Sequence, residues 1–84
     1  MNRITKEDLE IKIGDINYLL DTEAYFLSGA YGGYRLERNG KYGGTSDVFN
    51  VGFMPKRKLY EHLMAFIKGL IIGKRNGSRR YGRR

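Results

Sequence analysis

The chain has 84 residues, with 16 Lys and Arg against nine Asp and Glu, and therefore a formal net charge of +7. It contains no cysteine, which excludes a disulfide framework and a thiolate metal site. No apolar run reaches the roughly 18 residues that a membrane-spanning helix needs, and no secretory leader is visible. We therefore expect a cytoplasmic protein with no membrane partner.

The length predicts one domain with a small core. Domains of this size bury only about 60% of the surface of their extended chain and are marginally stable alone. We therefore expect a partner, or a second copy of the chain in a homodimer, to contribute to stability.

The charge is distributed unevenly along the chain. Residues 1–34 hold three basic and six acidic side chains, residues 35–72 hold seven and three, and the remaining residues hold six and none. The last segment has few apolar groups to offset the entropy that is lost on ordering. We therefore predict a compact domain over residues 1–72 and a flexible basic tail over residues 73–84.

The first predicted element is a helix over about residues 5–20. Thr5 is typical of the residue that caps a helix, and Glu7 and Asp8 lie where the helix dipole favours negative charge. Apolar residues then recur at spacings of 4, 3 and 4, the pattern of one buried helical stripe: Leu9, Ile13, Ile16 and Leu20.

Strand patterns follow. Residues 24–28 and 31–38 are rich in aromatic side chains with partial alternation, and Asn39-Gly40 favours a hairpin turn because both residues accept a positive φ. Residues 48–53 alternate cleanly and place three apolar side chains on one face: Phe49, Val51 and Phe53. We expect two or three antiparallel strands, with many of the tyrosines and glycines on the face away from the helices.

A second helix is predicted from Pro55, because the first turn of a helix does not need the missing N–H. Its apolar stripe again has spacings of 4, 3 and 4: Leu59, Leu63, Phe66 and Leu70. Gly69 favours a helix end, although the apolar residues 70–72 can extend the helix. The order helix, meander, helix predicts a small single α+β domain with both helices on one face of the sheet.

A glycine- and tyrosine-rich segment, SGAYGGY at residues 28–34, is the first candidate for function, and residues 40–44 repeat it weakly as GKYGG. Glycine lets a ligand or another backbone come close, and tyrosine rings stack on flat groups. The spacing is not that of a phosphate loop. The candidate partner surface comprises Tyr31, Gly32, Gly33, Tyr34 and Tyr42. The alternative is that these glycines relieve turns while the tyrosines shield the sheet.

The second candidate is the basic triplet Lys56, Arg57 and Lys58 in the first turn of the second helix. Three cations there oppose the helix dipole, and cations beside free backbone amides form an anion site for which phosphate is the usual occupant. We expect help in binding phosphate from Arg35 and Arg38. The alternative is a solvated turn that pairs with acidic side chains, namely Asp47 or Glu61.

The third candidate is the basic tail, whose six cations suit a phosphate backbone: Lys74, Arg75, Arg79, Arg80, Arg83 and Arg84. Flexible basic arms bind mainly by counterion release, so their affinity falls steeply with salt. The alternatives are a solubilising end or an arm that meets an acidic protein.

Catalytic and metal-binding patterns are thin. His62 is the only histidine, and a set of Ser28 or Ser46 with His62 and Asp47 has no supporting spacing. The acidic residues show no calcium-loop spacing. We therefore predict no enzyme activity, no catalytic residue, no metal and no cofactor.

Three segments in order resemble a family of small bacteriophage and prophage proteins. They are ITKEDL at residues 4–9, SGAYGGYRL at residues 28–36 with the Gly43-Gly44 loop, and PKRKLYEHLMAFIKGL at residues 55–70. The basic tail is not part of this pattern, and the segment before the first strand looks short for it. The resemblance implies a mobile-element protein that works by binding in the host cell cytoplasm.

Two functions therefore stay open. The first is a non-enzymatic protein that engages the phosphate backbone of DNA or RNA through the second helix start and the tail. The second is an anti-defence inhibitor, similar to an anti-CRISPR protein, that blocks a bacterial nuclease or another nucleic-acid-handling host enzyme, with the glycine–tyrosine face as its contact surface.

Overall fold

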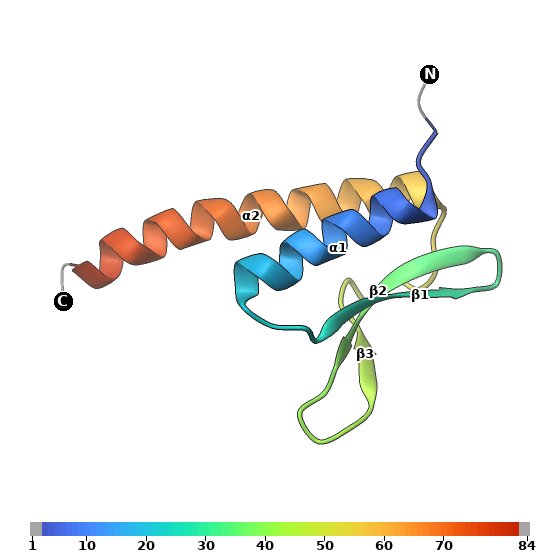
Figure 1. The fold of residues 1–84 in the computed structure, drawn as a ribbon, viewed down its shortest axis with the longest axis horizontal. Coiled ribbons are helices and arrows are strands. Elements are labelled where there is room, and N and C mark those ends of the chain that lie inside the picture. The colour runs from blue at the N-terminus through green and yellow to red at the C-terminus, as the bar shows by residue number, and fades with distance from the viewer. Residues whose placement is uncertain (1–2, 83–84) are drawn as a thin grey trace.

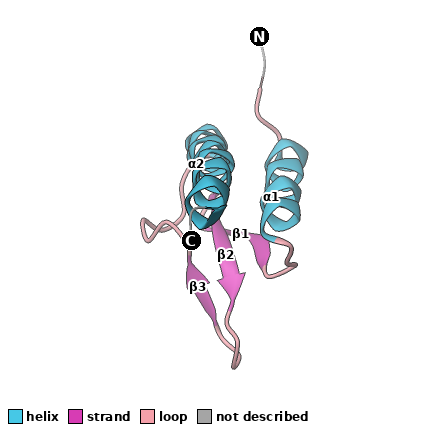
Figure 2. Cartoon of the chain, turned by 90° about the vertical axis from the view of Figure 1, so that its left-hand side faces the viewer, coloured by secondary structure: helices cyan, strands magenta, loops and turns pink. Residues whose placement is uncertain are grey.

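The computed structural model describes residues 3–82, and the side chains of residues 3–73. Two helices lie side by side on one face of a three-stranded antiparallel sheet with the order β1-β2-β3, and they run in the same direction (Figure 1, Figure 2). The elements are α1 (Lys6–Leu20), β1 (Tyr25–Ala30), β2 (Gly33–Asn39), β3 (Thr45–Asp47) and α2 (Lys56–Gly82). The predicted α+β architecture is confirmed.

Helix α1 begins and ends where local chemistry requires. The Thr5 hydroxyl accepts a hydrogen bond from the Asp8 backbone N–H at 3.1 Å, and the Asp8 carboxylate accepts one from the Thr5 N–H at 2.9 Å. This reciprocal capping box satisfies two of the unpaired amides at the helix start. Asp21 ends the helix in the left-handed conformation with φ of 55°. The prediction of a helix over residues 5–20 is confirmed.

The tight hairpin turn lies at Tyr31-Gly32. Both residues have positive φ, 54° and 75°, and Ala30 pairs directly with Gly33, so the two-residue turn joins β1 to β2. Positive φ at both central positions is the type I′ geometry that matches strand twist. The hairpin predicted from Asn39-Gly40 is present as the β2–β3 hairpin, but Asn39 still pairs with Thr45, so the turn is the longer loop 40–44.

The third strand is shorter and earlier than predicted. Residues 48–53 form an irregular loop because the Asp47 carboxylate accepts hydrogen bonds from the backbone amides of Asn50 at 3.1 Å and Gly52 at 2.7 Å. Asn50 and Gly52 consequently take positive φ, which breaks the extended backbone that alternation implies. Val51 is 60% exposed as a result.

The core lies between the helices and the sheet. It consists of seven buried apolar residues: Leu9, Ile13 and Ile16 of α1, Leu36 of β2, Met54, and Leu59 and Leu63 of α2. Tyr25 and Tyr34 also pack against this cluster. The expectation that the tyrosines occupy the outer sheet face is therefore wrong for these two residues, because they share the Leu36 face, on which the helices lie.

Helix α2 continues past the predicted end. Gly69 and Gly73 do not take the positive φ of a helix-ending glycine, and the backbone runs in helical form to Gly82. The expected helix end near residues 69–72 is therefore wrong. The predicted flexibility of residues 73–84 stays a prediction, because the side chains from Lys74 onward lie outside those described. Within residues 3–82, neither helix combines the length and apolar character needed to cross a bilayer.

Candidate functional site

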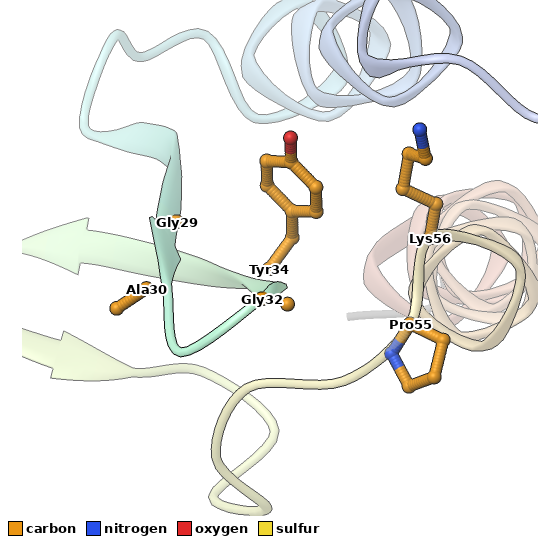
Figure 3. Close-up of a pocket in the computed structure, with 7 residues that line it drawn as sticks. Gly29, Ala30, Gly32, Tyr34, Pro55 and Lys56 are labelled. Carbon is orange, nitrogen blue, oxygen red and sulfur yellow. The ribbon is translucent and has the colours of Figure 1, made fainter.

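The two strongest candidate segments meet at one end of the molecule. The β1–β2 hairpin and the start of α2 border an open hollow of about 600 Å³ (Figure 3). Its lining combines the glycine–tyrosine segment with Pro55 and the first residue of the basic triplet: Gly29, Ala30, Gly32, Gly33, Tyr34, Pro55 and Lys56.

A backbone bridge joins the two sides of this hollow. The Tyr34 N–H donates to the Met54 carbonyl, and the Met54 N–H donates to the Tyr34 carbonyl, each at 2.8 Å. The bridge fixes the residue just before Pro55 against β2, so α2 begins beside the hairpin. Gly33 permits this contact, since a Cβ at that position would lie 3.0 Å from the Met54 carbonyl oxygen.

Two side chains rise from the hollow in the same direction. Figure 3 shows the Tyr34 ring and the Lys56 side chain extending toward α1. Both residues are half-buried. The Lys56 ammonium forms no ion pair with a carboxylate of residues 3–73. A cation beside an aromatic hydroxyl is a suitable pair for an anionic, hydrogen-bonding ligand.

The start of α2 concentrates positive charge. Pro55 precedes the helix and has no capping side chain, and the first helical bond runs from the Leu59 N–H to the Pro55 carbonyl at 3.0 Å. The first turn holds no acidic residue, while Arg57 and Lys58 are exposed. The orphan amides of the turn and the positive end of the dipole therefore add to the charges of the triplet.

Asp47, one of the two acidic residues considered as partners of the triplet, belongs to a network on the opposite face of the sheet. Arg35 Nε donates to Glu37 Oε2 at 2.7 Å, Arg35 Nη1 lies 3.8 Å from Asp47 Oδ2, and Arg35 Cζ lies 4.3 Å from the centre of the Phe53 ring. The predicted contact of Arg35 with phosphate stays a prediction. In this structure its guanidinium contacts Glu37, Asp47 and the Phe53 ring.

Glu37 is the centre of that network and is only 6% exposed. The hydrogen bond from Arg35 holds the pKa of Glu37 below its ordinary value of 4.5, side-chain hydrogen bonds with Ser28 and Thr45 act in the same direction, and burial opposes them. Opposite charges at Arg35 and Glu37, two residues apart on one strand, share a face, which is the sequence signal for this pair.

The other predicted residues are split between the two ends of the sheet. Tyr31 is 94% exposed in the hairpin turn, and its ring contacts Phe53 edge-on at 5.6 Å between centroids. Tyr42 is equally exposed but lies in the β2–β3 loop, at the other end of β2 (Figure 1). Arg38 is also at that end, with its guanidinium 5.7 Å from the Tyr25 ring centroid. The predicted partner surface is therefore two surfaces.

His62 has structural contacts on α2 and with the loop 48–53. Its Nδ1 lies 2.9 Å from the Lys58 carbonyl oxygen, and its ring meets Phe49 edge-on at 5.1 Å. No group of three or more metal-binding side chains occurs in the described part of the chain.

Comparison of the chain with protein-family models, with curated proteins and with solved structures gives no match. The resemblance to bacteriophage proteins therefore stays a prediction.

Proposed function

We propose that the protein binds the phosphate backbone of a nucleic acid without catalysing a reaction. The observation that carries this proposal is the basic triplet at an uncapped helix start beside the hollow: Lys56, Arg57 and Lys58. Cations at a helix start are suited to bind phosphate. A nucleic acid repeats phosphate groups along its backbone, so the six Lys and Arg of residues 74–84 can bind further phosphates of the same chain.

The neighbouring hairpin adds a surface that suits a base. Tyr31 is 94% exposed at the tip and is supported from one side by Phe53. An exposed aromatic ring can stack on an unpaired base without reading its identity. We therefore expect binding with little sequence preference and with some preference for single strands or duplex ends.

The test is fluorescence anisotropy with labelled single-stranded and duplex DNA and RNA, measured over a salt series. The native chain should bind tightly at low salt and lose affinity steeply as salt rises. The triple variant Lys56→Gln, Arg57→Gln and Lys58→Gln should lower the slope of log K against log salt by about 2 to 3, because each phosphate contact contributes about 0.7 to 0.9.

The matched control removes the same charge elsewhere, on α1, the β2–β3 loop and the later part of α2: Lys12→Gln, Lys41→Gln and Lys68→Gln. An equal loss in both variants would show that only net charge matters and would contradict a site at the α2 start. No binding of any probe at low salt would end the proposal.

The second candidate, a phage anti-defence inhibitor of a host nuclease, is favoured by one feature. The β1–β2 hairpin projects past the starts of both helices and presents Tyr31 at its tip, a shape suited to contact with a protein cleft (Figure 1). A nuclease-treated pull-down from host lysate tests it, with Tyr31→Ala and a chain ending at Ile72 as variants. Recovery of one stoichiometric partner that Tyr31→Ala loses supports it, and recovery of none contradicts it.

A further inference from the structure

The hydrogen-bonding direction of each residue in β1 follows from one contact. The Asn39 N–H donates to the Ala24 carbonyl at 2.9 Å, so these two residues form a hydrogen-bonded pair at the start of the ladder. In an antiparallel pair, hydrogen-bonded and non-hydrogen-bonded positions alternate. The backbone groups of Tyr25, Leu27 and Gly29 therefore point away from β2, toward the outer edge of the sheet.

Strand β2 gives an independent check. Tyr34 and Leu36 lie opposite Gly29 and Leu27 in the register. Both use their backbone groups on the side away from β1, Tyr34 with Met54, and Leu36 by accepting from the Val48 N–H at 3.0 Å. The pairs between β1 and β2 at these positions are therefore of the non-hydrogen-bonded kind, as the alternation requires.

The outer edge of β1 is closed at one end only. The Asn17 side chain pairs with Tyr25 as a strand would, donating to its carbonyl at 3.0 Å and accepting from its N–H at 3.1 Å. Within residues 3–82, no hydrogen bond is found for the edge-facing groups of Leu27 and Gly29. Figure 1 shows that this end of the hairpin extends past the starts of both helices.

This open edge lacks the features that normally keep edges apart. Exposed edge strands usually carry a charged residue, a proline or a bulge that blocks pairing with another chain. The strand Tyr25–Ala30, with the sequence YFLSGA, has no charged residue and no proline, and its pairing with β2 continues without a bulge. The chain has a net charge of +7, but residues 25–30 themselves carry no charge that would oppose a second copy of the same strand.

The side chains of β1 match a second copy of the same strand. We propose that two copies pair antiparallel along this edge, with Ser28 opposite Ser28 of the partner subunit. Leu27 then faces the partner's Gly29, and Phe26 faces the partner's Ala30, so each large side chain meets a small one on both faces of the sheet.

The same register satisfies the backbone. Leu27 and Gly29 of the two copies form two hydrogen-bonded pairs about the two-fold axis, while Ser28 sits on the axis in a non-hydrogen-bonded pair. A shift by one residue would place edge-facing groups opposite groups that already bond β2. The product is a continuous six-stranded sheet made of two three-stranded sheets.

Disulfide trapping tests this register directly, because the native chain has no cysteine. Residues opposite each other in a non-hydrogen-bonded pair have Cα atoms about 4.5 Å apart, within the disulfide range of about 4.4 to 6.8 Å. Under mild oxidation, Ser28→Cys should form a covalent dimer at least about ten-fold faster than the exposed control Ser46→Cys on β3. Phe26→Cys should be slow, because its own copies lie far apart along the strands.

A second measurement does not depend on cysteine. Sedimentation of the native chain should show a dimer, and Ala30→Lys, which places a charge against Phe26 of the partner subunit, should weaken association at least about ten-fold. Ser46→Lys is its control, and circular dichroism checks that both variants fold. A native chain that stays monomeric at high concentration, or Ser28→Cys dimers that form no faster than those of Ser46→Cys, would overturn the proposal. Faster trapping at Phe26→Cys would overturn the register.

Discussion

At the scale of single residues, Glu37 shows how a carboxylate is retained inside a small sheet. It is 6% exposed, and Arg35, two residues away, supplies a hydrogen bond of 2.7 Å. Asp47 shares the same guanidinium at 3.8 Å. Arg35 is thus a structural residue first, and a phosphate ligand would have to compete with two carboxylates for it.

The lowered pKa of Glu37 predicts a pH dependence with a definite sign. The ionised carboxyl stabilises the folded state, so its contribution is fully present above pH 4.5 and is lost as the pH falls through the lower pKa of the folded state. Glu37→Gln should be about 1–2 kcal/mol less stable than the native chain near neutral pH, and the difference should shrink in acid.

Urea unfolding over a pH series measures this difference. Glu10→Gln on the exposed surface of α1 is the control, and its stability should follow that of the native chain at every pH. A constant gap between Glu37→Gln and the native chain down to low pH would contradict the assigned role of Glu37.

Gly33 gives a second prediction at the residue scale. A methyl group there would lie 3.0 Å from the Met54 carbonyl oxygen, and backbone cannot move aside as a side chain tip can. Gly33→Ala should destabilise the fold by about 1–3 kcal/mol. Gly14→Ala is a matched control, since a methyl group there meets nothing within 4 Å and helix propensity should make it neutral or stabilising. Thermal unfolding distinguishes them, and equal melting temperatures would contradict the account of the hollow.

At the scale of elements, the parts that could be predicted are those that local chemistry decides. The capping box at Thr5 and the apolar stripes of α1 and α2 depend on neighbours within one or two turns, so the sequence predicts both helices. The hollow depends on the backbone bridge between Tyr34 and Met54, which are far apart in the chain. No periodic pattern in the sequence predicts this bridge.

The misplaced third strand has a single local cause. Phe49, Val51 and Phe53 alternate as a strand does, but the Asp47 carboxylate binds the amides of Asn50 and Gly52 and turns the backbone. Asp is typical of such turns. The sequence therefore contained two opposing indications, Asp47 for a turn and the alternation of residues 48–53 for a strand.

We therefore expect the conformation of the loop 48–53 to depend on the Asp47 carboxylate. Asp47→Ala removes two hydrogen bonds to the backbone and one ion pair, and it should destabilise the protein by about 1–3 kcal/mol. Amide exchange measured by NMR should accelerate most at Asn50 and Gly52. Asp15→Ala is the control, because its exposed pair with Lys12 at 3.8 Å should contribute little. Unchanged exchange at both amides would contradict the role of Asp47.

At the scale of the whole molecule, the two proposals place opposite demands on salt. Binding of a polyanion releases counterions, so added salt weakens it. Pairing of two chains, each with a net charge of +7, brings like charges together, so added salt should strengthen it by screening their repulsion. The contacts proposed at the β1 edge are backbone hydrogen bonds and packing of uncharged side chains, so salt should affect these contacts little.

We therefore predict that the affinity for nucleic acid and the affinity of the dimer change in opposite directions with salt, which two measurements over the same salt range can show. Between about 0.05 and about 0.5 M salt, across which the screening length falls several-fold, anisotropy should show falling affinity for nucleic acid. Sedimentation over the same range should show tighter dimers. At low salt, a short oligonucleotide should promote the Ser28→Cys dimer, since bound phosphate neutralises the repulsion that salt would otherwise screen. If dimerisation weakens with salt in parallel with nucleic-acid binding, then ionic contacts and not the β1 edge hold the two copies together.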